Sequence, residues 1–353
     1  MVRILMSQVG IALLVVALAH PGCASRRPAE QPPGCTDIAN TQQFNILTLN
    51  VLYDAPSTVR ERSWAEIAQF AVANNVHVIL VQEAVMTDVG RLADLLGTSD
   101  SARDFQRVLN GVSLEPYDLR VAWESGVPLV LATANAILSR CAITRHLWTF
   151  LPIETEEIFE GIDFKVTRNV ELARINVPGY GDAHVYNTHL CSACSVEGRQ
   201  RQVDALLGFV QQSESVVPSP HVLLSGDFNL DITTGGAEET QYQTIMSVGF
   251  RDVYAEFRRT AFGQPAKTLC ANGIADVHCT DGVSPLRGLI ATQTGADFST
   301  PKRLDYIFLR GGDSIQASRV IFNPGNASTG PIDPDQPAVS DHSGVFAQIT
   351  LIR

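Results

Sequence analysis

Two short stretches, HVYNTHL at residues 184–190 and HVLLSGDFN at residues 221–229, decide how this chain is built. Each begins as an apolar run of the kind that forms a buried strand, and each ends in polar residues. The polar ends are a histidine in the first stretch and an Asp-x-Asn turn in the second. We therefore take the ends of these two strands as the first candidates for a functional site.

The same arrangement recurs at four other places in the chain. These are Asn50 after the run 44–49, Gln82 and Glu83 after 77–81, Asp305 within 303–309, and Asp341 with His342 before the final strand. Packing in a core gives no reason for carboxylates, amides and imidazoles to recur at strand ends. The pattern is typical of one polar site assembled at the edge of a sheet.

Strand-like runs outnumber helical runs, and the connections between them are long and polar. The expected strands cover 44–51, 76–81, 118–123, 129–138, 170–177, 183–190, 221–225, 304–309 and 344–351. The expected helices lie near 64–72, 86–96, 197–212 and 238–248, and long loops are expected at 281–302 and 323–337. This order favours an α/β sandwich of two sheets with helices outside, in one domain.

The composition is that of an ordinary globular protein. Of the 353 residues, 45% are hydrophobic and 18% are charged, and the formal net charge is −11. Proteins that bind polyanions without regard to sequence usually carry a basic patch, so this balance disfavours nucleic acid as a partner.

The N-terminus has the pattern of an export signal over residues 1–23. Arg3 precedes the apolar run Ile11–Ala19, and small residues follow it. The run is shorter than the roughly 20 residues that a membrane span needs. Ala17-Leu18-Ala19 offers one cleavage site, and Cys23 in an imperfect lipobox offers the other. We expect a secreted protein or a bacterial cell-envelope lipoprotein with lipid on Cys23, and a flexible tether over residues 24–43.

Seven cysteines are present, and six remain once Cys23 is set aside. An even number suits disulfides in an oxidising compartment. Two pairs are close in sequence, and a third pair remains: Cys191 with Cys194, Cys270 with Cys279, and Cys35 with Cys141. A zinc site is the alternative interpretation of the close pairs.

Taken together, the polar strand ends resemble the endonuclease/exonuclease/phosphatase superfamily, which has the fold of deoxyribonuclease I. The matching segments occur in the family's order and cover residues 44–353: TLN (48–50), QE (82–83), ANAILSR (134–140), NTHL (187–190), SGDFN (225–229), RLDYI (303–307) and SDH (340–342). The resemblance implies a four-layer αββα sandwich of two mainly antiparallel sheets with outer helices. It also implies hydrolysis of a phosphoric ester with Mg²⁺, or with Mn²⁺ or another divalent cation as the alternative.

The resemblance assigns a role to each strand-end residue. The implied metal contacts are Asn50, Glu83 and Asp341, which offer the oxygen atoms that Mg²⁺ prefers. The implied catalytic residues are His189, Asp227, Asn229, Asp305 and His342. His342, oriented by Asp305, is the expected general base, and His189 is expected to contact the phosphoryl oxygens and to protonate the leaving oxygen. Asn229 is expected to bind the same phosphate, Asp227 to position the attacking water, and Arg168 or Arg174 to reach the phosphate.

The substrate is expected to be a phosphodiester. Three features favour a phospholipid such as sphingomyelin: the histidine of NTHL, the Arg199, Gln200 and Gln202 that follow it as in secreted sphingomyelinases, and the export signal. Residues 268–302 contain a single candidate, Phe298, rather than the exposed aromatic pair that membrane-entering relatives carry. The alternatives are an extracellular nuclease, a phosphomonoesterase and an inactive surface-binding module, and no expected catalytic position is missing to support the last. We expect a monomer that reaches the membrane surface through Cys23.

Overall fold

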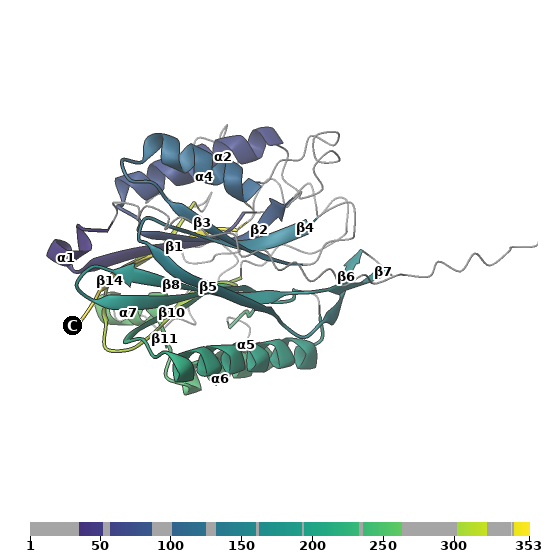
Figure 1. Ribbon diagram of the computed structural model, residues 1–353. Helices are drawn as coiled ribbons and strands as arrows, with labels where there is room; N and C mark the ends of the chain where they lie inside the picture. The colour runs from purple at the N-terminus through teal and green to yellow at the C-terminus, as the bar shows by residue number, and fades with distance from the viewer. Residues whose placement is uncertain are drawn as a thin grey trace, which may run out of the picture. The chain divides into compact units, whose positions relative to one another are not determined.

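The apolar runs of the sequence form the strands of two six-stranded sheets, and these sheets pack face to face (Figure 1). The architecture was obtained as a computed structural model. It describes residues 35–51, 57–86, 101–124, 132–159, 162–192, 194–232, 236–262, 302–322, 340 and 342–353. All of these belong to one compact unit, residues 32–353.

The first sheet has the strand order β13-β14-β1-β2-β4-β3. Its strands are β1 (Gln43–Asn50), β2 (Val78–Met86), β3 (Asp118–Trp123), β4 (Ala132–Ser139), β13 (Ser314–Ile321) and β14 (Gly344–Thr350). β1 and β2 are parallel, and the other neighbours are antiparallel. The parallel pair brings the C-terminal ends of β1 and β2 together.

The second sheet has the order β11-β12-β10-β9-β8-β5. Its strands are β5 (Ile143–Phe150), β8 (Asn169–Val177), β9 (Gly181–His189), β10 (His221–Asp227), β11 (Arg251–Asp252) and β12 (Asp305–Arg310). Here β9 and β10 form the parallel pair. A separate hairpin, β6 (Glu154–Phe159) with β7 (Ile162–Val166), lies between β5 and β8 in sequence.

Helices cover the outer faces of both sheets (Figure 1). α2 (Ser57–Ala73) and α4 (Ser101–Val112) pack on the first sheet, where Trp64 stacks on Phe105 at 4.6 Å between ring centroids. α5 (Val196–Val216) and α6 (Ala237–Ser247) pack on the second sheet. The short α1 (Ile38–Thr41) precedes β1, and α7 (Val253–Phe262) follows β11. The predicted four-layer αββα sandwich of mainly antiparallel sheets is confirmed.

The space between the sheets is apolar at one end and polar at the other. On β1 the inward side chains change from Phe44 and Ile46 to Thr48 and Asn50, all of them buried. The same change occurs along other strands: Ala183 and Val185 to Asn187 and His189 on β9, Ala173 to Glu171 and Asn169 on β8, and Leu309 and Ile307 to Asp305 on β12. Alternate residues of a strand point to the same face of its sheet. The polar residues at the ends of these strands therefore gather at one end of the space between the two sheets.

Amide side chains connect the two sheets at this level. Gln82 of the first sheet donates from Nε2 to Asn187 Oδ1 of the second at 2.7 Å. Asn135 of the first sheet donates from Nδ2 to Asn169 Oδ1 of the second at 2.9 Å. These residues are fully buried, so the bonds offset part of the cost of burying their amides and help to fix how one sheet lies on the other.

Two disulfides are present among the described residues, Cys35–Cys141 and Cys191–Cys194. They confirm two of the three expected pairs and leave no zinc site at Cys191 and Cys194. Cys23, Cys270 and Cys279 lie outside the described residues.

The expected strands are present, and the helices near 64–72, 197–212 and 238–248 correspond to α2, α5 and α6. α4, β5, β6, β7, α7 and β13 were not expected from the sequence. The helix expected near 86–96 and both long loops fall almost wholly outside the described residues. In the described part of the chain, no helix combines the length and apolar character that crossing a membrane requires.

Candidate active site

Asn50 and Glu83 come from the ends of the parallel strands β1 and β2. Glu83 lies where the pairing of β2 with β4 shifts register, between Val81 and Ala84, and its backbone has a φ of 58°. Such an irregularity re-aims a side chain within a strand, and a left-handed non-glycine residue is often found at a functional site. Asn50 Nδ2 donates to Glu83 Oε1 at 3.0 Å, so both side chains meet between the sheets.

His189 and Asp227 occupy paired positions at the ends of β9 and β10. The close approach of these strands depends on Gly226, whose φ is 136° and whose missing Cβ would lie 1.9 Å from the Thr188 carbonyl oxygen. Asn229 follows in a left-handed conformation, with a φ of 51°. Its backbone nitrogen donates to Asp227 Oδ1 at 2.9 Å, and its Nδ2 donates to the Leu190 carbonyl at 3.0 Å.

His342 and Asp305 form a hydrogen-bonded pair. His342 Nδ1 lies 2.8 Å from Asp305 Oδ2, and both residues are buried. The Ser340 hydroxyl donates to the Asn50 carbonyl at 2.7 Å and accepts from the His342 backbone nitrogen at 3.2 Å. The segment before β14 is thereby held against the end of β1. Because the Asp305 carboxylate can only accept, Nδ1 of His342 is the donor in this bond. A neutral His342 ring therefore carries its proton on Nδ1, and its Nε2 is unprotonated.

His189 has the opposite arrangement. Arg168 Nη1 lies 2.9 Å from His189 Nδ1, so a neutral ring accepts there and carries its proton on Nε2. Glu124 Oε2 lies 3.5 Å from the same Nδ1 and 3.4 Å from Arg168 Nη1. Burial and the Arg168 charge lower the pKa of His189, but Glu124 and Asp227 outweigh them, so that pKa is raised on balance. Nε2 therefore carries a proton whether the ring is neutral or charged.

Asp227 is the point on which the other groups converge. Its Oδ2 lies 3.6 Å from His189 Nε2, 3.8 Å from His342 Nε2 and 3.0 Å from Asn50 Nδ2. Burial raises the pKa of Asp227, but the two histidines and the hydrogen bonds from Asn50 and Asn229 outweigh burial, and the net pKa is lowered. The carboxylate therefore stays ionised at neutral pH.

Oxygen donors suited to a divalent cation converge at Asn50. Its amide contacts one carboxylate from each sheet, Glu83 and Asp227, and carboxylate and amide oxygens are the ligands that Mg²⁺ and Mn²⁺ prefer. A second grouping of metal-binding type consists of Asp227, Asp305 and His342, whose donor atoms lie within 4.8 Å of one another. In that grouping His342 already uses Nδ1 to bind Asp305, and an ion would take up its remaining nitrogen.

The structure brings together the predicted site residues that it describes: Asn50, Glu83, His189, Asp227, Asn229, Asp305 and His342. Asp341 lies outside the described residues. Of the two arginines proposed to reach the phosphate, Arg168 is in the site, whereas Arg174 pairs with His184 farther back along β9. Glu124 was missed, although it directly follows a strand as the predicted residues do.

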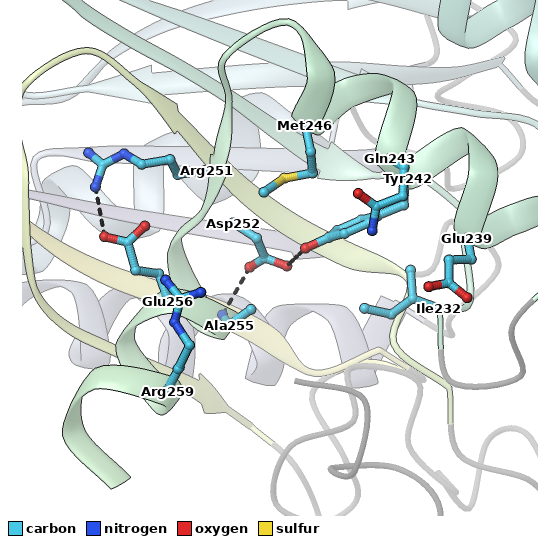
Figure 2. A pocket seen from close by; sticks show the side chains of 10 residues that line it. All are labelled: Ile232, Glu239, Tyr242, Gln243, Met246, Arg251, Asp252, Ala255, Glu256 and Arg259. Carbon is cyan, nitrogen blue, oxygen red and sulfur yellow. Dashed lines mark hydrogen bonds and ion pairs between the residues drawn. The ribbon is translucent and has the colours of Figure 1, made fainter. Parts of the chain in front are cut away.

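A cavity of about 460 Å³ lies elsewhere, between α6, β11 and α7 (Figure 2). In it Asp252 accepts from the Tyr242 hydroxyl at 2.9 Å and from the Ala255 backbone nitrogen at 3.1 Å. None of the described site residues lines this cavity. It is therefore separate from the candidate active site.

An αββα sandwich with two differently oriented histidines, an ionised aspartate and a cluster of oxygen donors defines a hydrolase of phosphoric esters. The family model described as "Endonuclease/Exonuclease/phosphatase family" matches residues 47–342. The chain belongs to this family, whose enzymes depend on a divalent metal. No curated protein matches the sequence significantly.

Solved structures of the same fold come from several bacteria. A family protein of Bacteroides thetaiotaomicron has a TM-score of 0.57 at 16% identity, covering 88% of this chain and 98% of its own. A family protein of Leptotrichia buccalis has a TM-score of 0.56 at 20% identity, covering 87% and 99%. The mannosyl-6-phosphatase of Bacteroides thetaiotaomicron has a TM-score of 0.55 at 16% identity, also covering 87% and 99%.

Proposed function

We propose that this hydrolase is an exported phosphodiesterase with Mg²⁺ as its cation. Its substrate is a phospholipid such as sphingomyelin, whose phosphodiester it hydrolyses at a membrane surface. One observation carries the phosphodiesterase assignment. The neutral His342 ring has an unprotonated Nε2, His189 has a protonated Nε2, and both nitrogens lie within 3.8 Å of one Asp227 oxygen. Cleaving a phosphodiester requires a base for water and an acid for the leaving alkoxide, and this pair supplies both.

The residues act in a defined order. His342, with its ring held by Asp305, accepts the proton of a water molecule that Asp227 orients for attack on phosphorus. His189 donates its Nε2 proton to the leaving oxygen. Arg168, which contacts the other nitrogen of His189, supplies positive charge beside the phosphate. The second hydrogen of the Asn229 amide is available to a phosphoryl oxygen while the first binds Leu190.

Asn50 and Glu83, with Asp227 beside them, are the residues that would hold the cation, and Asp341 is proposed to join them. When bound, Mg²⁺ draws charge from the phosphoryl oxygens and stabilises the leaving alkoxide. This placement does not use His342 Nε2 as a metal ligand, whereas the grouping of Asp227, Asp305 and His342 does.

A lipid substrate is supported by an exposed aromatic pair next to the site. Trp148 and Phe150 are 39% and 52% exposed, and their rings meet edge to face at 5.1 Å. Both lie on the edge strand β5, and Leu151, the residue that follows it, donates to the Arg168 carbonyl at 2.8 Å. Ile153, three residues beyond Phe150 in the sequence, is also exposed, at 59%. Amphipathic aromatics beside a polar site are typical of proteins that work at a bilayer surface.

The first experiment compares substrates. Residues 24–353 are assayed with Mg²⁺ and with EDTA on sphingomyelin vesicles, plasmid DNA, bis(p-nitrophenyl) phosphate and a soluble inositol phosphate. We expect EDTA-sensitive cleavage of the vesicles and of the small diester. Cleavage of DNA alone would reject the lipid substrate in favour of a nuclease. Release of phosphate from monoesters alone would indicate a phosphatase, and no activity on any of them would reject the enzyme.

Two pairs of variants test the finer assignments. Glu83→Gln should lose Mn²⁺ affinity in calorimetry, whereas Asp305→Asn should keep that affinity and lose turnover. The reverse result would move the cation to Asp305. Trp148→Ala/Phe150→Ala should lose activity on vesicles but keep activity on bis(p-nitrophenyl) phosphate. Val248→Ala, an exposed apolar residue that follows α6, is the matched control.

A further inference from the structure

His189 ends β9 and Asn229 lies just after β10, and an arginine on α5 connects the loops that follow these two strands. Arg199 is 6% exposed and has all three of its nitrogen atoms engaged. Its Nε donates to the Cys191 carbonyl at 3.0 Å, and its Nη2 donates to the Ser192 carbonyl at 2.7 Å. These carbonyls lie two and three residues beyond His189.

The third nitrogen of Arg199, Nη1, is connected to the loop after β10 through Glu238. Nη1 donates to Glu238 Oε1 at 2.6 Å, and Glu238 lies in the first turn of α6. Glu238 Oε2 in turn accepts from the Asp231 backbone nitrogen at 2.9 Å, two residues beyond Asn229. A single chain of charge-assisted bonds therefore joins both loops, and such bonds are stronger than neutral ones.

Other contacts also hold the first loop. Gln202, one turn along α5 and fully buried, accepts from the Cys191 backbone nitrogen at 2.9 Å. The Cys191–Cys194 disulfide closes the loop, and the Ser195 side chain caps α5 by accepting from the Gly198 nitrogen at 3.0 Å. Asn229 Nδ2 reaches back to the Leu190 carbonyl. The loops are thus fixed to each other and to the two helices.

We propose that Arg199 and Glu238 are positioning residues for catalysis, and we name them the Arg199–Glu238 clamp. The clamp sets the distance between His189, which protonates the leaving group, and Asn229, which binds the phosphate. This inference rests on the roles proposed for those two residues. Neither clamp residue touches the reacting atoms, so its loss acts through geometry, and misplacement by about 1 Å can cost on the order of 10²-fold in rate.

The test measures kcat and KM on bis(p-nitrophenyl) phosphate for a matched set of variants. Arg199→Met should lower kcat by about 10- to 100-fold and leave KM within about twofold. Glu238→Ala should act in the same direction. Glu238→Gln keeps one acceptor oxygen but turns an NH2 donor toward the other donor, so it should lower kcat by an intermediate amount. Arg201→Met is the control, because Arg201 lies on the same helix but its partner is Glu154, away from both loops.

Three further measurements make the outcome decisive. The double variant Arg199→Met/Glu238→Ala should be no worse than Arg199→Met alone, because both changes break one chain of bonds. Hydrogen exchange at the backbone amides of Cys191 and Asp231 should be faster in both single variants. This measurement reports loosening of the two loops independently of enzyme activity. Thermal unfolding should remain cooperative in each variant.

The results separate the clamp from the proposed function. Unchanged kcat in Arg199→Met and Glu238→Ala, with His189→Ala inactive, would overturn the clamp and leave the function intact. The clamp would also be overturned if Arg201→Met lost as much kcat as Arg199→Met. The same conclusion would follow if the fall in kcat equalled the fall in the fraction of folded protein. An active His189→Ala would instead reject the role proposed for His189.

Discussion

Glu124 is the residue whose importance only the folded chain reveals, since it adjusts His189 from behind. Its carboxylate raises the pKa of His189 against burial and the Arg168 charge. Glu124 is itself buried and also accepts from the Thr133 hydroxyl at 3.2 Å. Of the groups that raise the pKa of His189, Glu124 has the largest effect, and it lies at Nδ1 rather than at the Nε2 proposed to protonate the leaving oxygen.

We predict that Glu124→Gln lowers the pKa of His189, because the opposing effects of burial and Arg168 then dominate. His189 is the proposed acid, so the high-pH limb of the kcat/KM profile should move to lower pH. Activity at neutral pH should fall by about tenfold or more. The measurement is a pH–rate profile on a soluble diester. Glu256→Gln, at the separate cavity between α6 and α7, should leave the profile in place. A high-pH limb that does not move would separate Glu124 from proton transfer.

Gly226 shows how a backbone requirement determines a motif residue. A methyl group there would overlap the Thr188 carbonyl oxygen and force β9 and β10 apart. We predict that Gly226→Ala costs about 3 kcal/mol or more in the free energy of unfolding. Gly208→Ala is the control: it lies within α5, a Cβ there meets nothing within 4 Å, and it should stabilise by about 0.5–1 kcal/mol. Urea unfolding of both variants measures the difference, and equal effects would contradict the steric argument.

Sequence patterns located the site residues because each lies at one end of an apolar strand. The family resemblance also implied that Asp305 orients His342, but nothing in the sequence predicted which groups contact Nδ1 of His189. Arg168 is brought to His189 by the pairing of β8 with β9, whereas Asp305 and His342 meet because the two sheets pack face to face.

At the scale of elements, β8 carries a buried carboxylate that the proposed mechanism does not use. Glu171 is fully buried, accepts from Asn187 Nδ2 at 2.9 Å and lies 2.8 Å from His146 Nε2 on β5. Burial is the largest influence on its pKa, and it outweighs the bonds to His146 and Asn187, so the pKa is raised. Glu171 connects the amide bonds between the sheets to the edge strand.

The raised pKa of Glu171 makes the stability of the fold depend on pH. A carboxyl group whose pKa is higher when folded than when unfolded contributes its stability fully below the unfolded value of about 4.3. That contribution is lost as the pH rises through the folded pKa. Glu171→Gln removes this loss and keeps an acceptor for Asn187. We predict that the variant gains in unfolding free energy relative to the wild type as the pH rises from 4 to 8. A constant difference would show that Glu171 does not titrate abnormally.

Elements with a strong period and a polar end were predictable, whereas those that depend on their neighbours were not. β13 has no strict alternation, since residues 314–317 are all partly or fully exposed, and it is a strand because β14 lies beside it. β5 has an exposed outer half, Trp148–Phe150, and pairs only with β8. The polar and half-exposed composition of such edge strands gives little local signal, so tertiary pairing decides their structure.

For the whole molecule, the Cys35–Cys141 disulfide joins the beginning of the described chain to the end of β4. The bridged residues are 106 positions apart, and both are fully buried beside Phe44 and Ile46. The neighbouring Asp37 contacts Asn75 and His77. The hydrogen bond from His77 is the largest influence on the pKa of Asp37, which lies far below its usual value. The apolar end of the sandwich, opposite the polar site, is therefore closed by a covalent bond and by the hydrogen bonds of Asp37.

A disulfide lowers the entropy of the unfolded chain by an amount that grows with the loop it closes. We therefore predict that Cys35→Ser/Cys141→Ser loses about 2–5 kcal/mol in unfolding free energy, while kcat of the folded protein is unchanged. The Cys191–Cys194 disulfide closes a loop between residues only three apart. Cys191→Ser/Cys194→Ser should therefore lose roughly 2 kcal/mol or less in unfolding free energy. Because that second disulfide lies beside His189, its removal should lower kcat instead. Urea unfolding and turnover of both variants test this division, and equal effects on both quantities would show that the two bridges do not differ in role.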